Sequence, residues 1–176
     1  WGKCKLATTS YGHGITTTPI QLAKGYAILA NGGYDIKPTL IKKEFYNSEK
    51  KRILNKNLSS QINTMFRKVV QKGTATLSDV DGYEVGGKTG TAQIVEKGVY
   101  TNKKINTFAS IFPSSNPKYI LLVLLEDTKL SKNYVYKYRN KPGSYKGTPF
   151  NTAGWTSVEI SGKIIDKIGP ILATKY

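Results

Sequence analysis

The chain has 176 residues and a formal net charge of +16, from 27 Lys and Arg against 11 Asp and Glu. Its length suits one domain of about 150 residues, and a hydrophobic fraction of 39% excludes a disordered tail. The single cysteine, Cys4, excludes an intrachain disulfide and a cysteine-based zinc cluster. No apolar run approaches the ~18 residues that a membrane-spanning helix needs.

The first part of the chain predicts two helices separated by extended and turn segments. Residues 1–18 are rich in Gly, Thr and Ser, which favours extended or looped chain. A helix over residues 19–30 follows, because Thr18 can act as its N-cap and Pro19 suits its first position. Residues 34–46 contain short β-favouring runs such as 39–41, and 47–57 is a charged turn region. A second helix over about 59–71 carries one apolar face, formed by Leu58, Ile62, Met65, Phe66, Val69 and Val70.

The rest of the chain changes to an extended period and then returns to helix. Residues 85–95, 105–112 and 118–126 predict three strands, with a hairpin turn at 113–117. The run 120–125 is apolar on both faces, so we expect it to be covered on both sides. Residues 129–149 predict a long polar loop. A last helix begins near Thr156, which with Glu159 fits a capping box, and it ends or bends at Gly169-Pro170. Its predicted buried stripe is Ile160, Ile164, Ile165 and Ile168. This order of elements predicts an α+β fold.

The motif that carries chemistry is Lys88-Thr89-Gly90-Thr91, inside the first predicted strand. A glycine within a strand often marks a place where another group approaches the backbone, so Gly90 would let a ligand lie against the strand. Thr89 and Thr91 are two residues apart and share one face. Two hydroxyls beside the Lys88 cation would suit a carboxylate, and an extended peptide could add to the strand edge. The alternative is an edge strand with a solvated lysine, because the KTG triplet is common by chance.

Further segments extend this motif to nearly the whole chain. They are Tyr11-Gly12-His13-Gly14, the run from Thr18 to Ala23, Ala30-Asn31-Gly32-Gly33, Gly73-Thr74-Ala75, the run from Gly86 to Gln93, and the strand pair formed by 108–112 and 119–125. In this order and spacing, the chain resembles the C-terminal half of the transpeptidase domain of class B penicillin-binding proteins. The resemblance implies a partial serine β-lactamase and transpeptidase fold: helices, a three-stranded antiparallel sheet and a C-terminal helix. Residues 1–176 would form the C-terminal portion of a single domain.

The resemblance also implies roles for the matching residues. KTG is one of three active-site motifs of this fold, alongside S-x-x-K and S-x-N. Lys88 and Thr91 would be catalytic: Lys88 would support the proton network, and the Thr91 backbone N–H would donate to the oxyanion hole. Thr89, Gly90 and Thr91 would bind the terminal carboxylate of a peptidoglycan stem peptide or of a β-lactam. No metal or other cofactor is expected.

The implied activity is D,D-transpeptidation through an acyl-enzyme on serine, in cell wall synthesis and of the division type. The partners would be a lipid-linked peptidoglycan precursor and cell-division membrane proteins. The place would be the periplasmic side of a bacterial inner membrane. No nucleic acid is expected as a partner.

The nucleophile is the point of departure from the family. Its S-x-x-K and S-x-N motifs precede all the segments that match here. The literal matches Ser48-x-x-Lys51, Ser115-x-x-Lys118, Ser114-Ser115-Asn116 and Ser131-Lys132-Asn133 lie in turns or loops, out of family order. We therefore expect no nucleophile in this chain, which would be a fragment that supplies the substrate-binding strand and is inactive alone.

Two other classes of function stay open. The loop 129–149 has six basic and no acidic residues, interleaved with four tyrosines, so a polyanion or single-stranded nucleic-acid binder is one alternative. A non-catalytic remnant is the other, and its strand at 119–126 would present an unpaired apolar edge that favours aggregation. The only histidine, His13, has no visible partner for base catalysis, and Cys4 lacks the basic surroundings of a reactive thiol.

Overall fold

The computed structural model describes residues 4–10, 12, 14–41, 51–138, 142–147 and 150–175. Three helices come first: α1 (Lys5–Thr9), α2 (Pro19–Ala30) and α3 (Lys56–Lys72), followed by the 3-10 turn η1 (Thr76–Ser78). The strands are β1 (Gly86–Glu96), β2 (Val99–Phe112), β3 (Tyr119–Glu126), β4 (Val135–Lys137) and β5 (Ser144–Lys146). The 3-10 turn η2 (Ala153–Trp155) and helix α4 (Ser157–Ala173) complete the chain. The predicted α+β fold is confirmed.

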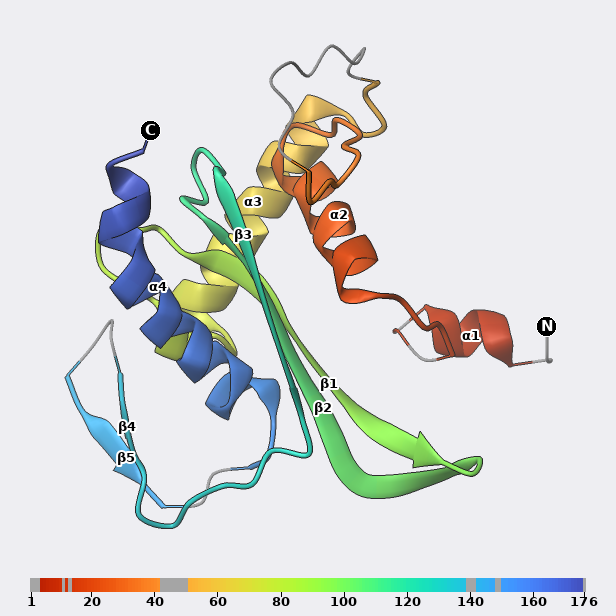
Figure 1. The fold of residues 1–176 in the computed structure, drawn as a ribbon, viewed down its shortest axis with the longest axis vertical. Coiled ribbons are helices and arrows are strands. Elements are labelled where there is room, and N and C mark those ends of the chain that lie inside the picture. Colours follow the sequence, from red (N-terminus) through yellow and green to blue (C-terminus); the bar gives the residue numbers. More distant parts are fainter. Residues whose placement is uncertain are drawn as a thin grey trace.

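The main sheet is antiparallel, with β2 between β1 and β3. Thr89 of β1 lies opposite Phe108 of β2, which lies opposite Val123 of β3. The strand β2 begins at Val99, earlier than predicted, because Lys97 and Gly98 both adopt positive φ angles and close a tight hairpin with β1. The β1–β2 hairpin extends as an arm beyond the part of the sheet that β3 covers (Figure 1).

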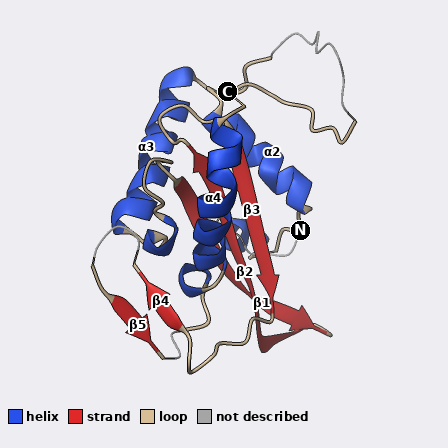
Figure 2. Cartoon of the chain, turned by 60° about the vertical axis from the view of Figure 1, so that its left-hand side comes forward, coloured by secondary structure: helices blue, strands red, loops and turns tan. Residues whose placement is uncertain are grey.

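Helices cover both faces of the sheet, as Figure 2 shows for α4 and α2. On the α4 face, Phe108 and Ile165 are fully buried in the larger core. On the other face, Ala30 of α2, Phe66 of α3 and Ile111 form a smaller core. The helix α3 serves both, because Phe66 joins the second core while Val70, one turn later, joins the first. The helix α3 also contacts β1, the strand that carries the candidate site residues.

The helix ends show why some boundaries agree with the sequence and others do not. The hydroxyl of Thr18 accepts the Gln21 N–H at 3.3 Å, and the Gln21 side chain accepts the Thr18 N–H at 2.9 Å, so this predicted cap is confirmed. The predicted capping box of α4 is wrong: the Thr156 hydroxyl donates to the Thr152 carbonyl at 2.9 Å. Glu159 instead accepts a hydrogen bond from the Tyr134 hydroxyl at 2.8 Å.

Several other expectations need correction. The helix α1 forms within a segment predicted as looped, and 39–41 is not a strand. The helix α3 begins at Lys56, because the Asn55 side chain caps the Asn57 N–H at 2.8 Å. Leu58 and Met65 of its predicted apolar face are exposed. The loop 129–149 contains the β4–β5 ribbon, and α4 continues through Pro170 to Ala173.

The strand β3 is covered as predicted on both faces, by α4 and by α2. The cover is incomplete, since the Leu124 side chain is 46% exposed. Within the described residues, β3 pairs only with β2, so its other edge carries no strand. None of the described helices has the length and apolar character needed to cross a bilayer.

Candidate functional site

The candidate site is the outer edge of β1, which has β2 as its only neighbouring strand in the described part of the chain. An edge strand leaves alternate backbone N–H and C=O groups free to pair with an extended ligand. The two glycines that flank Lys88 and Thr89 differ sharply. A Cβ at Gly87 would lie 2.4 Å from the Ala109 carbonyl oxygen, whereas a Cβ at Gly90 would meet only Thr107, at 3.9 Å. Gly87 therefore serves packing, and Gly90 leaves the edge open.

The structure brings Thr89 and Thr91 together in one cleft of about 510 Å³. The cleft lies between the end of α3, η1, β1 and η2, and its lining is Lys72, Gly73, Thr74, Thr76, Leu77, Thr89, Thr91, Tyr138, Thr152, Gly154 and Trp155. The Thr89 and Thr74 hydroxyl oxygens are 2.9 Å apart, and the Thr91 hydroxyl accepts the Ala153 N–H at 3.0 Å. Each threonine is thus held by an element far away in sequence.

A count of hydroxyl protons shows what this cleft offers to a ligand. One proton is used between Thr74 and Thr89, whichever of them donates it. The Thr91 oxygen is an acceptor in its bond to Ala153, so its own proton is not used there. Of the three O–H groups of Thr74, Thr89 and Thr91, two therefore stay available to donate to an acceptor in the cleft. Such a pair of directed donors suits a carboxylate.

Lys88 lies on the other face of the strand. The register pairs Lys88 with Ala109 and Thr89 with Phe108, so the two side chains point to opposite sides of the sheet. The Lys88 ammonium donates to the carbonyl oxygen of Thr89 at 2.7 Å and does not line the cleft. Lys88 was expected to supply charge beside the two hydroxyls, and its ammonium does not line their cleft. Its role in catalysis stays a prediction.

The segment before α4 closes one side of the cleft. Asn106 of β2, which lies opposite Thr91, donates to the Asn151 side chain at 2.7 Å. Asn151 in turn donates to the Thr128 carbonyl at 2.9 Å. Together with the bond between Ala153 and Thr91, these contacts fasten η2 to the sheet. The sequence did not predict that this segment or Lys72 would line the site. The one signal near Lys72 was Gly73-Thr74-Ala75, which the sequence analysis used only for the family resemblance.

The rejected serine motifs lie away from the cleft wherever the structure describes them. Ser115 lies in the turn before β3, and its hydroxyl donates to the carboxylate of Glu84. The Ser131 hydroxyl accepts the Asn133 N–H at 3.3 Å. Ser48 and His13 lie outside the described residues. Cys4 is exposed, and no cluster of three potential metal ligands occurs in the described part of the chain.

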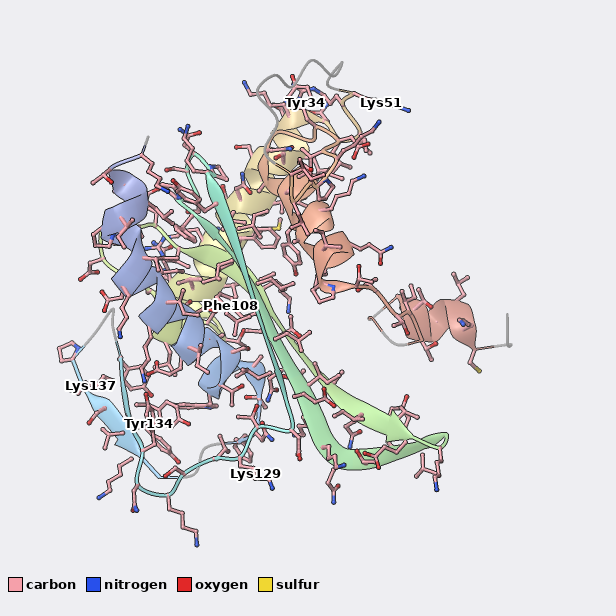
Figure 3. The ribbon with its side chains drawn as sticks, viewed as in Figure 1. Tyr34, Lys51, Phe108, Lys129, Tyr134 and Lys137 are labelled. Carbon is pink, nitrogen blue, oxygen red and sulfur yellow. The ribbon has the colours of Figure 1, made fainter. Side chains whose placement is uncertain are left out.

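Two tyrosines of the basic segment, Tyr134 and Tyr136, pack against the body of the fold, whereas Tyr145 is exposed. Tyr136 is buried and contacts Tyr134 and Trp155 edge to face, with ring centroids 4.7 and 5.1 Å apart. Figure 3 shows Tyr134 near the two-stranded β4–β5 sheet, which carries Lys137. The Lys163 ammonium lies 4.6 Å from the centre of the Tyr134 ring. Rings engaged in this way are poor platforms for stacked bases, which argues against the single-stranded nucleic-acid alternative.

The α+β fold with β1 as an open edge strand agrees with the transpeptidase fold that the sequence resembles. The model of the penicillin binding protein transpeptidase domain matches residues 1–145. The chain therefore belongs to the penicillin-binding protein transpeptidase family, as its resemblance implied.

Individual relatives agree with this assignment. The probable peptidoglycan D,D-transpeptidase FtsI of Caulobacter vibrioides is 30% identical over 99% of this chain and 29% of that protein. Stage V sporulation protein D of Bacillus subtilis is 34% identical over 73% of this chain and 22% of that protein. Among solved structures, the apo transpeptidase domain of Burkholderia pseudomallei penicillin-binding protein 3 superposes with a TM-score of 0.74 at 25% identity, over 97% of this chain and 47% of that one. The chain thus spans less than a third of these two relatives and about half of that domain.

Proposed function

We propose that this chain supplies the substrate-binding strand of a peptidoglycan D,D-transpeptidase of the division type. The observation that carries the proposal is the pair Thr89 and Thr91, which share one cleft on the open edge of β1. Their hydroxyls would donate to the terminal carboxylate of a stem peptide, or to that of a β-lactam. The peptide backbone would extend along the edge beside Gly90.

The acyl transfer itself needs groups from both sides of the scissile carbonyl. The Thr91 N–H would be one donor to the oxyanion, and losing such a donor typically costs ~2.7–4 kcal/mol of transition-state stabilisation. Lys88, on the opposite face of β1, would support the proton network of an S-x-N hydroxyl. The nucleophilic serine and its lysine would come from S-x-x-K outside this chain.

The wider setting follows from the family. The substrate would be the lipid-linked peptidoglycan precursor and its stem peptides, at the periplasmic side of a bacterial inner membrane. Cell-division membrane proteins would be its partners. A non-catalytic remnant remains the second candidate, and covalent labelling separates the two.

Fluorescent penicillin tests the proposal. We expect no label on the 176-residue chain and a serine-linked label on a polypeptide that joins it to the S-x-x-K and S-x-N segments. Replacing Thr89 by Val should slow acylation of that polypeptide about tenfold, because a hydrogen bond to a charged group is lost. Thr107→Val is the matched control, since Thr107 lies opposite Gly90 and points to the other face.

Each outcome has a clear reading. Stable labelling of the 176-residue chain alone would show that a serine within it is the nucleophile. Failure of the joined polypeptide to react would support the remnant and overturn the transpeptidase proposal.

A further inference from the structure

The cleft beside β1 contains a cation that the KTG motif does not provide. Lys72 is the last residue of α3 and the only charged residue among the described residues that line the cleft. Thr74, Thr89 and Thr91 line the same cleft. The cleft is thus lined by hydroxyl donors and by a lysine from a different element of the fold.

Local structure fixes the place of Lys72. The helix α3 ends at Gly73, whose N–H donates to the Val69 carbonyl at 3.1 Å. A Cβ at Gly73 would lie 2.8 Å from the same carbonyl oxygen, so the chain turns here only because the residue is glycine. The turn leads directly to Thr74, which holds the Thr89 hydroxyl. This turn places Lys72 among the residues that line the cleft.

The charge of Lys72 is not neutralised locally. It forms no ion pair with any residue in the described part of the chain, and the described lining of the cleft contains no acidic residue. Lys88 cannot substitute for it on this side, because its ammonium lies at the Thr89 carbonyl on the other face of β1. Among the described residues that line the cleft, Lys72 is thus the one cation beside the threonine hydroxyls.

We propose that Lys72 is a specificity residue of the cleft, which favours a ligand that ends in a free carboxylate over the same ligand with an uncharged end. This inference rests on the proposed function, since it concerns the same carboxylate subsite. The hydroxyls of Thr89 and Thr91 would orient the carboxylate, and Lys72 would supply the net positive charge. A lysine can do this without fixed geometry, because it acts as a point charge on a flexible stem.

The competing interpretation is purely structural. A lysine in the last turn of a helix interacts favourably with the negative end of the helix dipole. In that case, replacing Lys72 would lower stability and leave ligand preference unchanged. Lys68, one turn earlier on α3, is also exposed and does not line the cleft, so it provides a matched control for loss of charge.

The test compares two small probes, N-acetyl-D-alanyl-D-alanine and its C-terminal amide. Their binding to the ¹⁵N-labelled 176-residue chain is followed at low salt, where charge repulsion best opposes self-association, through the amide signals of Thr89 and Thr91. We expect the acid to bind more tightly than the amide, and Lys72→Gln to weaken acid binding about three- to fivefold, as for an ion pair open to solvent. Lys72→Arg should retain the preference, and Lys68→Gln should match the wild type.

Two results would overturn the proposal in different ways. If the wild type prefers the acid and Lys72→Gln binds it as well as Lys68→Gln does, Lys72 has no part in specificity while the carboxylate subsite stands. If the wild type does not distinguish acid from amide, the cleft is not a carboxylate subsite, and the proposed role of Lys72 is wrong as well. Penicillin labelling then reports separately on whether the parent protein is a transpeptidase.

Discussion

At the scale of single residues, two glycines of the KTG strand, Gly87 and Gly90, have different structural roles. The position of Gly87 has no room for a side chain, because the Ala109 carbonyl and the Phe108 ring lie 2.4 and 2.8 Å from where its Cβ would be. Gly90 faces open space apart from Thr107. One glycine lets β1 pack closely against β2, and the other keeps the strand accessible.

This contrast predicts opposite effects on stability. Gly87→Ala should lower the free energy of unfolding by about 1–3 kcal/mol, as for overpacking of a filled site. Gly90→Ala should leave it unchanged or raise it by about 0.5 kcal/mol, because alanine loses less backbone entropy than glycine. Urea unfolding curves of the two variants measure the difference, and equal stability of both would contradict the packing described for Gly87.

A second residue-scale feature is the ion pair that ties α3 to the segment before β1. The Arg67 guanidinium donates to the Asp79 carboxylate at 2.6 Å and to the Val85 carbonyl at 2.8 Å. The Asp79 side chain is only 9% exposed. Removal of Arg67 would leave this carboxylate buried without its charged partner.

Arg67→Ala should therefore destabilise the chain by about 3 kcal/mol, since breaking a buried pair leaves an uncompensated charge. The double variant Arg67→Ala, Asp79→Ala should recover part of that loss, because no charge then stays buried. Lys68→Ala is the surface control, expected within about 0.5 kcal/mol of wild type. Chemical denaturation of these proteins and of Asp79→Ala completes the double-mutant cycle, and a harmless Arg67→Ala would refute the structural role of the pair.

At the scale of elements, the contact between α2 and α3 includes a partly buried tyrosine, Tyr26. The Tyr26 ring lies 5.6 Å from the Phe66 ring, centroid to centroid. Burial raises the pKa of the Tyr26 phenol above its ordinary value of about 10. The folded chain therefore keeps this proton at a pH where the unfolded chain has lost it.

The consequence is a loss of stability in alkali. The contribution of Tyr26 is fully present below about pH 10 and is lost as the pH rises through its raised folded-state pKa. Tyr26→Phe should flatten this decline, although burial also raises the pKa of Tyr136, which adds a loss of the same sign. Thermal melts between neutral pH and pH 11 measure the slope; an unchanged slope in Tyr26→Phe would exclude this contribution.

At the scale of the whole molecule, a large positive charge coexists with an unpaired strand edge. The net charge of +16 favours solubility through repulsion between chains. The edge of β3 carries apolar residues, and Leu124 is 46% exposed. Salt screens the repulsion but leaves the apolar edge as it is.

We therefore expect the 176-residue chain to self-associate, and increasingly so as salt is added. Leu124→Lys should reduce association by placing a charge on the edge strand, with little loss of stability at an exposed position. Sedimentation velocity of both proteins at low and high salt provides the comparison. A monomeric wild type with a cooperative melt would contradict the expectation.

Local signals predicted those elements whose partners are close in sequence. The helix α2 with Thr18 as its N-cap needed no distant contact, and neither did the part of the predicted α3 face that is buried, at Phe66 and Val70. The hairpin turn between β2 and β3 was also predictable, since its proline-rich turn joins two β-favouring runs. The α4 cap failed because Tyr134, far away in the sequence, bonds Glu159. The β4–β5 ribbon was missed because its tyrosines are ordered by Trp155 rather than by a local pattern.

The amino-acid sequence by itself determined the family, the order of the main strands and the shared face of Thr89 and Thr91, because these depend on motifs and on strand periodicity. Only the tertiary structure decided what surrounds those hydroxyls. The glycine stop of α3 brought Lys72 to the cleft, and the bond between Ala153 and Thr91 closed its side. Each of these contacts joins segments that only packing of the whole chain brings together.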